Sequence, residues 1–157
     1  MEILDRTDAP IEGTRIHTIL LATDLSSASA NAEELAFELA ARLRGALLLV
    51  SVIDPRGLWM PNGRYRERMD QAREARQIAA KGIVDRARRE GVSVRTLIWH
   101  GDPAEAIVEA AVAEGVDLIV VGSHQRRGMD RLVMGSVSEQ VVRTSPVPVV
   151  VARRALP

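Results

Sequence analysis

Glycines and serines gather in one stretch near the C-terminal end of the chain. Residues 122–138 read GSHQRRGMDRLVMGSVS and end where a helix is predicted to begin. A helix N-terminus presents unpaired amides and the positive end of the helix dipole, which stabilise an anion such as phosphate. Gly135 and Ser136 could bring backbone and hydroxyl close to that anion, or they could only turn the chain and cap the helix. Three arginines add positive charge, at positions 126, 127 and 131.

A second polar position follows the first apolar run of the chain. Asp24 stands directly after the run that ends at Thr23. A carboxylate at the end of such a strand could bind a ribose or a base edge, or it could cap the following helix. The sequence leaves both interpretations open.

The sequence lacks the motifs of other common binding and catalytic sites. The chain has no cysteine and one lysine, Lys81, and it contains no Gly-x4-Gly-Lys-Ser/Thr, G-x-G-x-x-G or G-x-S-x-G motif. Its three histidines are far apart and form no metal-ligand pair. We therefore predict no catalytic residue and no metal ligand. Slow ATP hydrolysis, or autophosphorylation on Ser136 or Ser138, stays the less favoured alternative.

The amino-acid composition limits the kinds of partner that the protein is expected to bind. Lysine plus arginine and aspartate plus glutamate both number 21, and aromatic residues make up 3%, which argues against a nucleic-acid or membrane-surface protein. No apolar run approaches the ~18 residues of a membrane span. The first residues are acidic, unlike a signal peptide. We expect a cytoplasmic protein.

Short apolar runs alternate with helical patterns through the 157 residues. Strands are predicted over 19–23, 46–53, 92–99, 116–121 and 147–152. One helix is predicted over 29–44, where Gly45 ends it, and a second, longer helix ends at Gly91. A third begins at the N-cap Asp102, followed by Pro103 and Glu105, and ends at Gly115. A fourth begins with a capping box formed by Ser136 and Glu139. This alternation predicts a single-domain, Rossmann-like α/β fold: a five-stranded parallel sheet with helices on both faces.

The expected strand order is 3-2-1-4-5, which periodicity alone does not establish. The third strand alternates in polarity, and Pro148 lacks an amide donor, so both outer strands are expected at edges. Ligands of such sheets bind outside the carboxyl ends of the strands, where the order reverses. Here that point lies between the first and fourth strands, after Thr23 and after Val121.

The chain resembles the universal stress protein family from about Thr18 to Arg153. The matching stretches are ILLATDLS, LLLVSVID, HGDPAEAI, DLIVVGSH and GSVSEQVVRTSPVPVVVAR. The resemblance implies the parallel fold above, a homodimer and, in one branch of the family, ATP at the point of reversal. We predict a polar extension over 1–16 and the family domain over 17–154.

The nucleotide-binding branch carries Gly, two residues, Gly, nine residues and Gly-Ser. Gly122 and Gly135-Ser136 fit, but Gln125 replaces the middle glycine. Its side chain could crowd the phosphates or offer them an amide donor. By resemblance, ATP or AMP, with Mg²⁺ accompanying ATP, is expected at the following residues: Ala22, Thr23, Asp24, Val52, Gly122, Ser123, Gln125, Gly128, Gly135, Ser136, Val137 and Ser138.

The expected function is therefore an adenine-nucleotide-binding stress-response or signalling module. The alternative is a nucleotide-free dimeric interaction protein of the same fold. The dimer is expected through the edge strand Val147–Ala152, because an apolar edge is usually covered; the N-terminal extension could cover it instead. The apolar loop from Trp59 to Tyr65 could be a lid, a partner surface or a packed loop.

Overall fold

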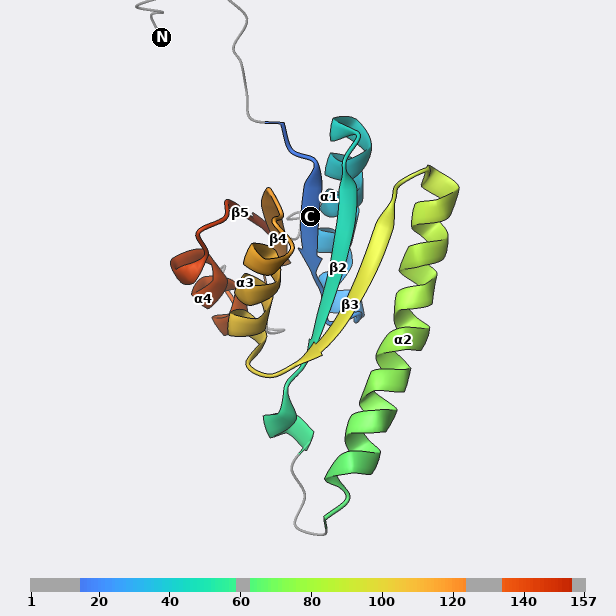
Figure 1. The fold of residues 1–157 in the computed structure, drawn as a ribbon, viewed down its shortest axis with the longest axis vertical. Helices are drawn as coiled ribbons and strands as arrows, with labels where there is room; N and C mark the ends of the chain where they lie inside the picture. Colours follow the sequence, from blue (N-terminus) through green and yellow to red (C-terminus); the bar gives the residue numbers. More distant parts are fainter. Residues whose placement is uncertain (1–14, 59–62, 124–133, 154–157) are drawn as a thin grey trace, which may run out of the picture.

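A five-stranded parallel sheet forms the centre of the molecule (Figure 1). The computed structural model describes residues 15–58, 63–123 and 134–153. The strands are β1 (Thr18–Ala22), β2 (Ala46–Ile53), β3 (Val94–His100), β4 (Leu118–Gly122) and β5 (Val149–Ala152). Their order, β3-β2-β1-β4-β5, confirms the predicted fold class and the point of reversal. Residues of the 124–133 loop, including Gln125 and Gly128, lie outside the described ranges.

Strand β1 lies in the middle and is bonded on both sides. Ile19 is paired with Leu47 of β2 and with Leu118 of β4. Its side chains alternate between two separate apolar cores: Ile19 and Leu21 belong to one, and Leu20 belongs to the other. A strand buried on both faces explains why this part of the sequence is a continuous apolar run rather than an alternating one.

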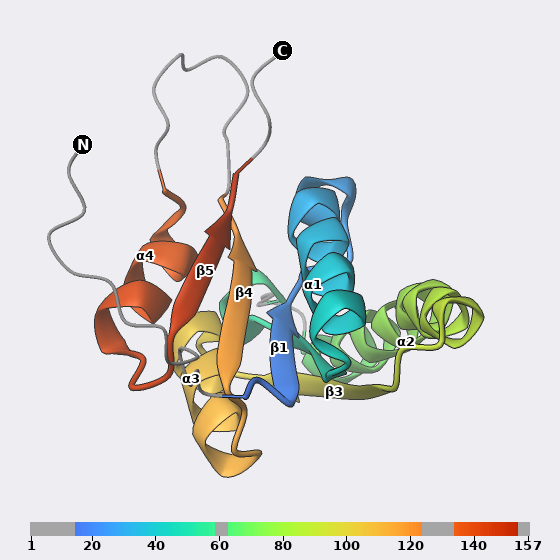
Figure 2. The same cartoon turned by 90° about the horizontal axis from the view of Figure 1, so that it is seen from above.

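Helices cover both faces of the sheet (Figure 2). Helices α1 (Ala30–Leu43) and α2 (Tyr65–Glu90) lie on one face, and α3 (Pro103–Ala113) and α4 (Ser136–Thr144) lie on the other. Helix α2 has only two buried residues, Ala80 and Ala87, because it packs at the margin of the sheet against β3 and β2. Within the described ranges, no helix has the length and apolar character to cross a membrane.

The helix ends confirm the predictions for Gly91, which is the left-handed C-cap of α2, and for Asp102, and they correct two others. Asp102 caps α3, since its side chain accepts hydrogen bonds from the amides of Ala104 and Glu105. The predicted stop at Gly45 is wrong by one residue: Arg44 takes the left-handed conformation, with φ of 54°. Gly45 is instead needed for space, because a Cβ there would lie 3.0 Å from the carbonyl oxygen of His17.

The capping box at the start of α4 is also wrong. The N-cap residue is Gly135 and no side chain caps the helix, while Ser136 is the first helical residue. The first turn of α4 instead makes a contact with a distant part of the chain: the hydroxyl of Ser138 donates a hydrogen bond to the carbonyl of Gly122 at the end of β4. That contact fixes where the helix can begin.

Both edge predictions are confirmed. β3 pairs with β2 and β5 pairs with β4, and each strand is outermost in the described sheet. Pro148 directly precedes β5, and its carbonyl accepts a hydrogen bond of 2.9 Å from the amide of Ile119. The proline therefore pairs with the sheet only through its carbonyl oxygen, because it has no amide hydrogen to donate.

The carboxylate of Asp117 ties the start of β4 to the start of β1. One oxygen accepts hydrogen bonds from the amides of His17 (2.8 Å) and Thr18 (2.9 Å). These amides, that of Thr18 first, lower the pKa of Asp117. The contact therefore stabilises the fold only while this carboxyl is ionised.

Replacing Asp117 with asparagine is expected to lower the free energy of unfolding by about 1 kcal/mol at pH 7. Because the folded pKa is the lower one, the advantage of the natural protein holds above the unfolded value of about 3.9 and disappears as the pH falls below it. Urea unfolding across that range measures the difference. Asp70→Asn, an exposed change on α2, serves as the control, and a difference independent of pH would contradict the assignment.

Candidate functional site

The two segments singled out by the sequence lie side by side at the carboxyl edge of the sheet. Ala22, at the end of β1, is paired with Val121 near the end of β4. Thr23 follows one strand and Ser123 follows the other. The structure therefore brings together residues that are about a hundred positions apart in the chain.

Thr23 builds the turn after β1. Its hydroxyl donates to a carboxylate oxygen of Glu33 and accepts from the amide of Leu25, both at 2.9 Å. Leu25 has a positive φ of 62°, a conformation that branched or bulky residues rarely adopt. The buried hydroxyl of Thr23 therefore holds the turn after β1.

Asp24 organises the next part of the same turn. Its Oδ1 atom accepts from the amide of Ser26 (2.9 Å) and from the hydroxyls of Ser26 and Ser29 (both 2.7 Å). Ser26 in turn caps the short 3₁₀ turn Ser27–Ser29 that leads into α1. Asp24 shapes this turn but does not cap the helix itself, because Ser26 is the N-cap of the short turn and Ser29 is the N-cap residue of α1. The Asp24 side chain is exposed at the sheet edge. A contact to a ribose or base stays a prediction.

Helix α4 is fastened to the end of β4 by one hydrogen bond. The hydroxyl of Ser138, a buried residue, donates to the carbonyl of Gly122 at 2.5 Å. The first amides of α4, from Ser136 to Ser138, have no acceptor within the helix. The bond therefore holds these amides at the same sheet edge as Asp24, while it occupies the Ser138 hydroxyl proton.

Ser123 carries a buried hydroxyl without a partner. Its amide donates to the carbonyl of Ala152 at 2.9 Å, which extends the pairing of β4 with β5. Its side-chain oxygen is buried and makes no hydrogen bond within the described part of the chain. Such groups are few in folded proteins.

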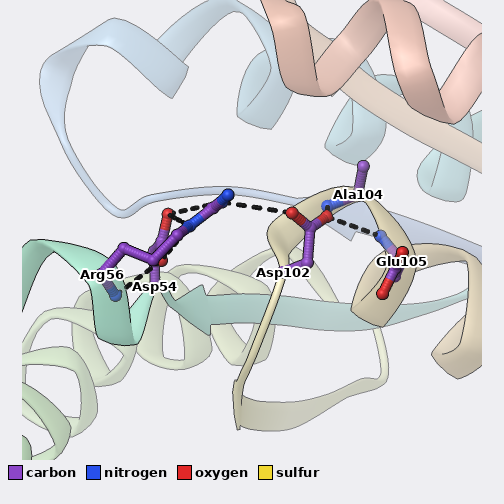
Figure 3. A network of polar contacts seen from close by, with 5 residues as sticks. All are labelled: Asp54, Arg56, Asp102, Ala104 and Glu105. Carbon is purple, nitrogen blue, oxygen red and sulfur yellow. Dashed lines mark hydrogen bonds and ion pairs between the residues drawn. The ribbon is translucent and has the colours of Figure 1, made fainter.

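The side of the site toward β2 and β3 contains a charged network that the sequence analysis missed (Figure 3). Val52, partly buried, lies near the end of β2, and Asp54 follows the strand. Arg56 donates to both carboxylate oxygens of Asp54 and, through Nη2, to Asp102 at 3.1 Å. Arg56 lowers the pKa of Asp54 through these hydrogen bonds. The network joins the end of β2 to the start of α3.

No local pattern in the sequence indicates this network. Asp102 was assigned only as a helix cap, and it is separated from Arg56 by 46 positions. Side-chain exposure is 69% at Arg56 and 31% at Asp102, so the ion pair itself adds little stability. Within the described ranges, no group of three or more histidine, aspartate or glutamate residues could hold a metal ion.

Known proteins resemble this chain in sequence and in fold. The model of the universal stress protein family matches residues 15–153. Universal stress protein MJ0531 of Methanocaldococcus jannaschii is 30% identical over 138 residues, 87% of this chain and 81% of that protein. The solved structure of MJ0577, from the same organism, superimposes with a TM-score of 0.78 at 28% identity and covers 92% of this chain and 100% of that one.

Two further structures of this fold hold nucleotides. A universal stress protein in complex with cAMP is 23% identical, with a TM-score of 0.67 over 89% of this chain and 98% of that chain. An Arabidopsis thaliana protein of the same family, with AMP bound, is 19% identical, with a TM-score of 0.66 over 88% of this chain and 92% of that one. At these identities the likeness is one of fold.

The hydrogen bond from Ser138 to Gly122 predicts unequal effects of two serine substitutions in one turn of helix. Ser138→Ala leaves the partly buried carbonyl of Gly122 without its donor and is expected to lower the free energy of unfolding by about 1–3 kcal/mol. Ser136→Ala, at an exposed position without a cap bond, is expected to change it by less than ~0.5 kcal/mol. Urea unfolding of both variants tests the assignment, which fails if their effects are equal.

Proposed function

The chain belongs to the universal stress protein family, and from this premise we propose that it binds an adenine nucleotide at the carboxyl ends of β1 and β4 and acts as a ligand-sensing module in a stress response. The proposal rests mainly on one observation. The Ser138 bond to Gly122 holds the free amides of α4 beside the unpartnered hydroxyl of Ser123, at the same edge as Asp24.

Each part of the site fits a part of a nucleotide. The amides of Ser136, Val137 and Ser138 and the exposed hydroxyl of Ser136 are donors for phosphate oxygens. The carboxylate of Asp24 is an acceptor for ribose hydroxyls. On this proposal the base lies toward Val52, at the end of β2.

ATP and AMP place different demands on this site. Mg²⁺ is commonly held by phosphates together with one or two carboxylates, so it would arrive with ATP rather than occupy a site of its own. Gln125, outside the described ranges, stands where the family motif has glycine. The proteins of the same fold described with cAMP and with AMP support an adenine nucleotide as the ligand class.

Nucleotide released from the purified protein tests the proposal. Protein purified without added nucleotide, then denatured, is expected to release an adenine nucleotide that chromatography and mass spectrometry identify. Ser136→Glu is expected to weaken nucleotide binding by about tenfold or more, because the new carboxylate repels the phosphates. An acidic residue in the first turn of a helix does not destabilise the fold.

Gln140→Glu is the matched control, since it adds the same charge to an exposed position one turn further along α4. Its affinity is expected to stay within about twofold of the natural protein, because an exposed charge away from the phosphates is screened by solvent. An empty protein that shows no thermal shift with millimolar ATP, ADP, AMP or cAMP contradicts the proposal. That result favours the nucleotide-free interaction module.

We also propose a homodimer through β5. Val149 to Val151 are only partly buried, and β5 has a neighbour on one side only in the described sheet. Pro148 and Ala152 are bonded to β4 through their carbonyls. Because successive residues of a strand point to opposite sides, the amides of Val149 and Val151 face the open edge.

Val149→Pro therefore removes an outward-facing amide without breaking the bonds to β4. The natural protein is expected to show a dimer mass by light scattering at micromolar concentration, and this variant is expected to show a larger monomer fraction with unchanged circular dichroism. Ile78→Lys, an exposed change on α2 near the opposite edge, is expected to remain dimeric. A monomeric natural protein would refute the dimer.

A further inference from the structure

The opposite edge of the sheet also presents unpaired backbone groups. In the described structure β3 pairs only with β2. The carbonyl of Ser93 accepts from Leu47, and the amide of Gly101 donates to Ile53, so the odd-numbered residues of this segment face β2. The amides and carbonyls of the even-numbered residues, from Val94 to His100, therefore point to the open edge.

Helix α2 forms a groove with this edge. The two elements run beside each other along the margin of the sheet (Figure 1). A groove of about 600 Å³ lies between them, lined by Thr96 and Ile98 of β3 and by a stripe of α2 from Arg73 to Arg88. That stripe is about 22 Å long, and the seven-residue strand beside it is about 23 Å long.

The inside of the groove is mostly apolar, with one unpartnered polar atom. Ala80 and Val84 line it from the helix, and Ile98 lines it from the strand. The hydroxyl oxygen of Thr96 is buried and makes no hydrogen bond within the described residues. Thr96 also directs its backbone amide and carbonyl to the open edge, so both its side chain and its backbone lack partners there.

The rim of the groove is positively charged. It carries Arg73, Lys81 and Arg88 against a single acidic residue, Asp85, which pairs with Arg88 at 3.6 Å. Arg73 and Lys81 form no ion pair with any described residue. A second copy of this edge would bring like charges together, which disfavours self-association here. An acidic chain is the complementary occupant.

We propose that this groove binds an extended acidic segment of a partner protein, which adds to the sheet as a further strand beside β3. The main chain of the segment pairs with the open groups of Thr96 and Ile98. Its apolar side chains lie against Ala80 and Val84, and its carboxylates meet Arg73 and Lys81. The site is separate from the proposed nucleotide site and does not depend on it.

The probe is a fluorescein-labelled peptide with the length of β3 in which every second residue is valine or glutamate in turn and the residues between are serine, so that valine and glutamate share the face toward α2. Fluorescence anisotropy with the full chain is expected to show saturable binding. Arg73→Glu and Lys81→Glu are each expected to weaken it by about tenfold. Arg89→Glu makes the same charge change at an exposed position of α2 outside the groove and is expected to have an effect below about twofold. Circular dichroism verifies that each variant is folded.

Two altered peptides separate strand addition from simple charge attraction. A peptide with lysine in place of glutamate tests the charge, and the acidic peptide N-methylated at alternate amides tests the main-chain pairing. Both are expected to lose binding. The proposal is overturned if the acidic peptide does not bind at millimolar concentration, if the N-methylated peptide binds equally well, or if Arg73→Glu converts a dimer of the natural protein to monomer.

Discussion

The rest of the structure depends on the burial of β1 between two neighbouring strands. With β2 on one side and β4 on the other, β1 separates the two apolar cores and requires a layer of helices on each face. Because all five strands are parallel, their carboxyl ends meet at one edge. The strand order reverses at β1, and the chain therefore leaves β1 and β4 toward opposite faces of the sheet, which is the place where ligands of such folds generally bind.

Short polar contacts hold that edge in place. Asp24 and Thr23 fix the turn after β1, and Ser138 fixes the start of α4 against Gly122. These side chains are engaged in building the backbone. The groups that remain directed outward are chiefly the first amides of α4 and the exposed hydroxyl of Ser136. The geometry thus separates residues that shape the site from residues that could contact an anion.

The two edges of the sheet differ in chemistry. The β5 edge is short and consists of three valines and an alanine, and Pro148 directly precedes it. The β3 edge is longer and lies beside the basic residues Arg73 and Lys81 of α2. Like charges oppose self-pairing at this second edge. The two ends of the sheet therefore differ in surface chemistry, with an apolar edge at β5 and a basic groove beside β3.

The sequence by itself determined the elements and the fold class, because apolar periodicity and the Asp102 cap depend on neighbouring residues. It also predicted that the ends of β1 and β4 lie side by side, which the structure confirms. Tertiary structure decided the rest. Arg44, rather than Gly45, turns left-handed, since Gly45 packs against the carbonyl of His17. Contacts across long separations, such as Arg56 with Asp102, arise from the packing of strands and leave no local pattern.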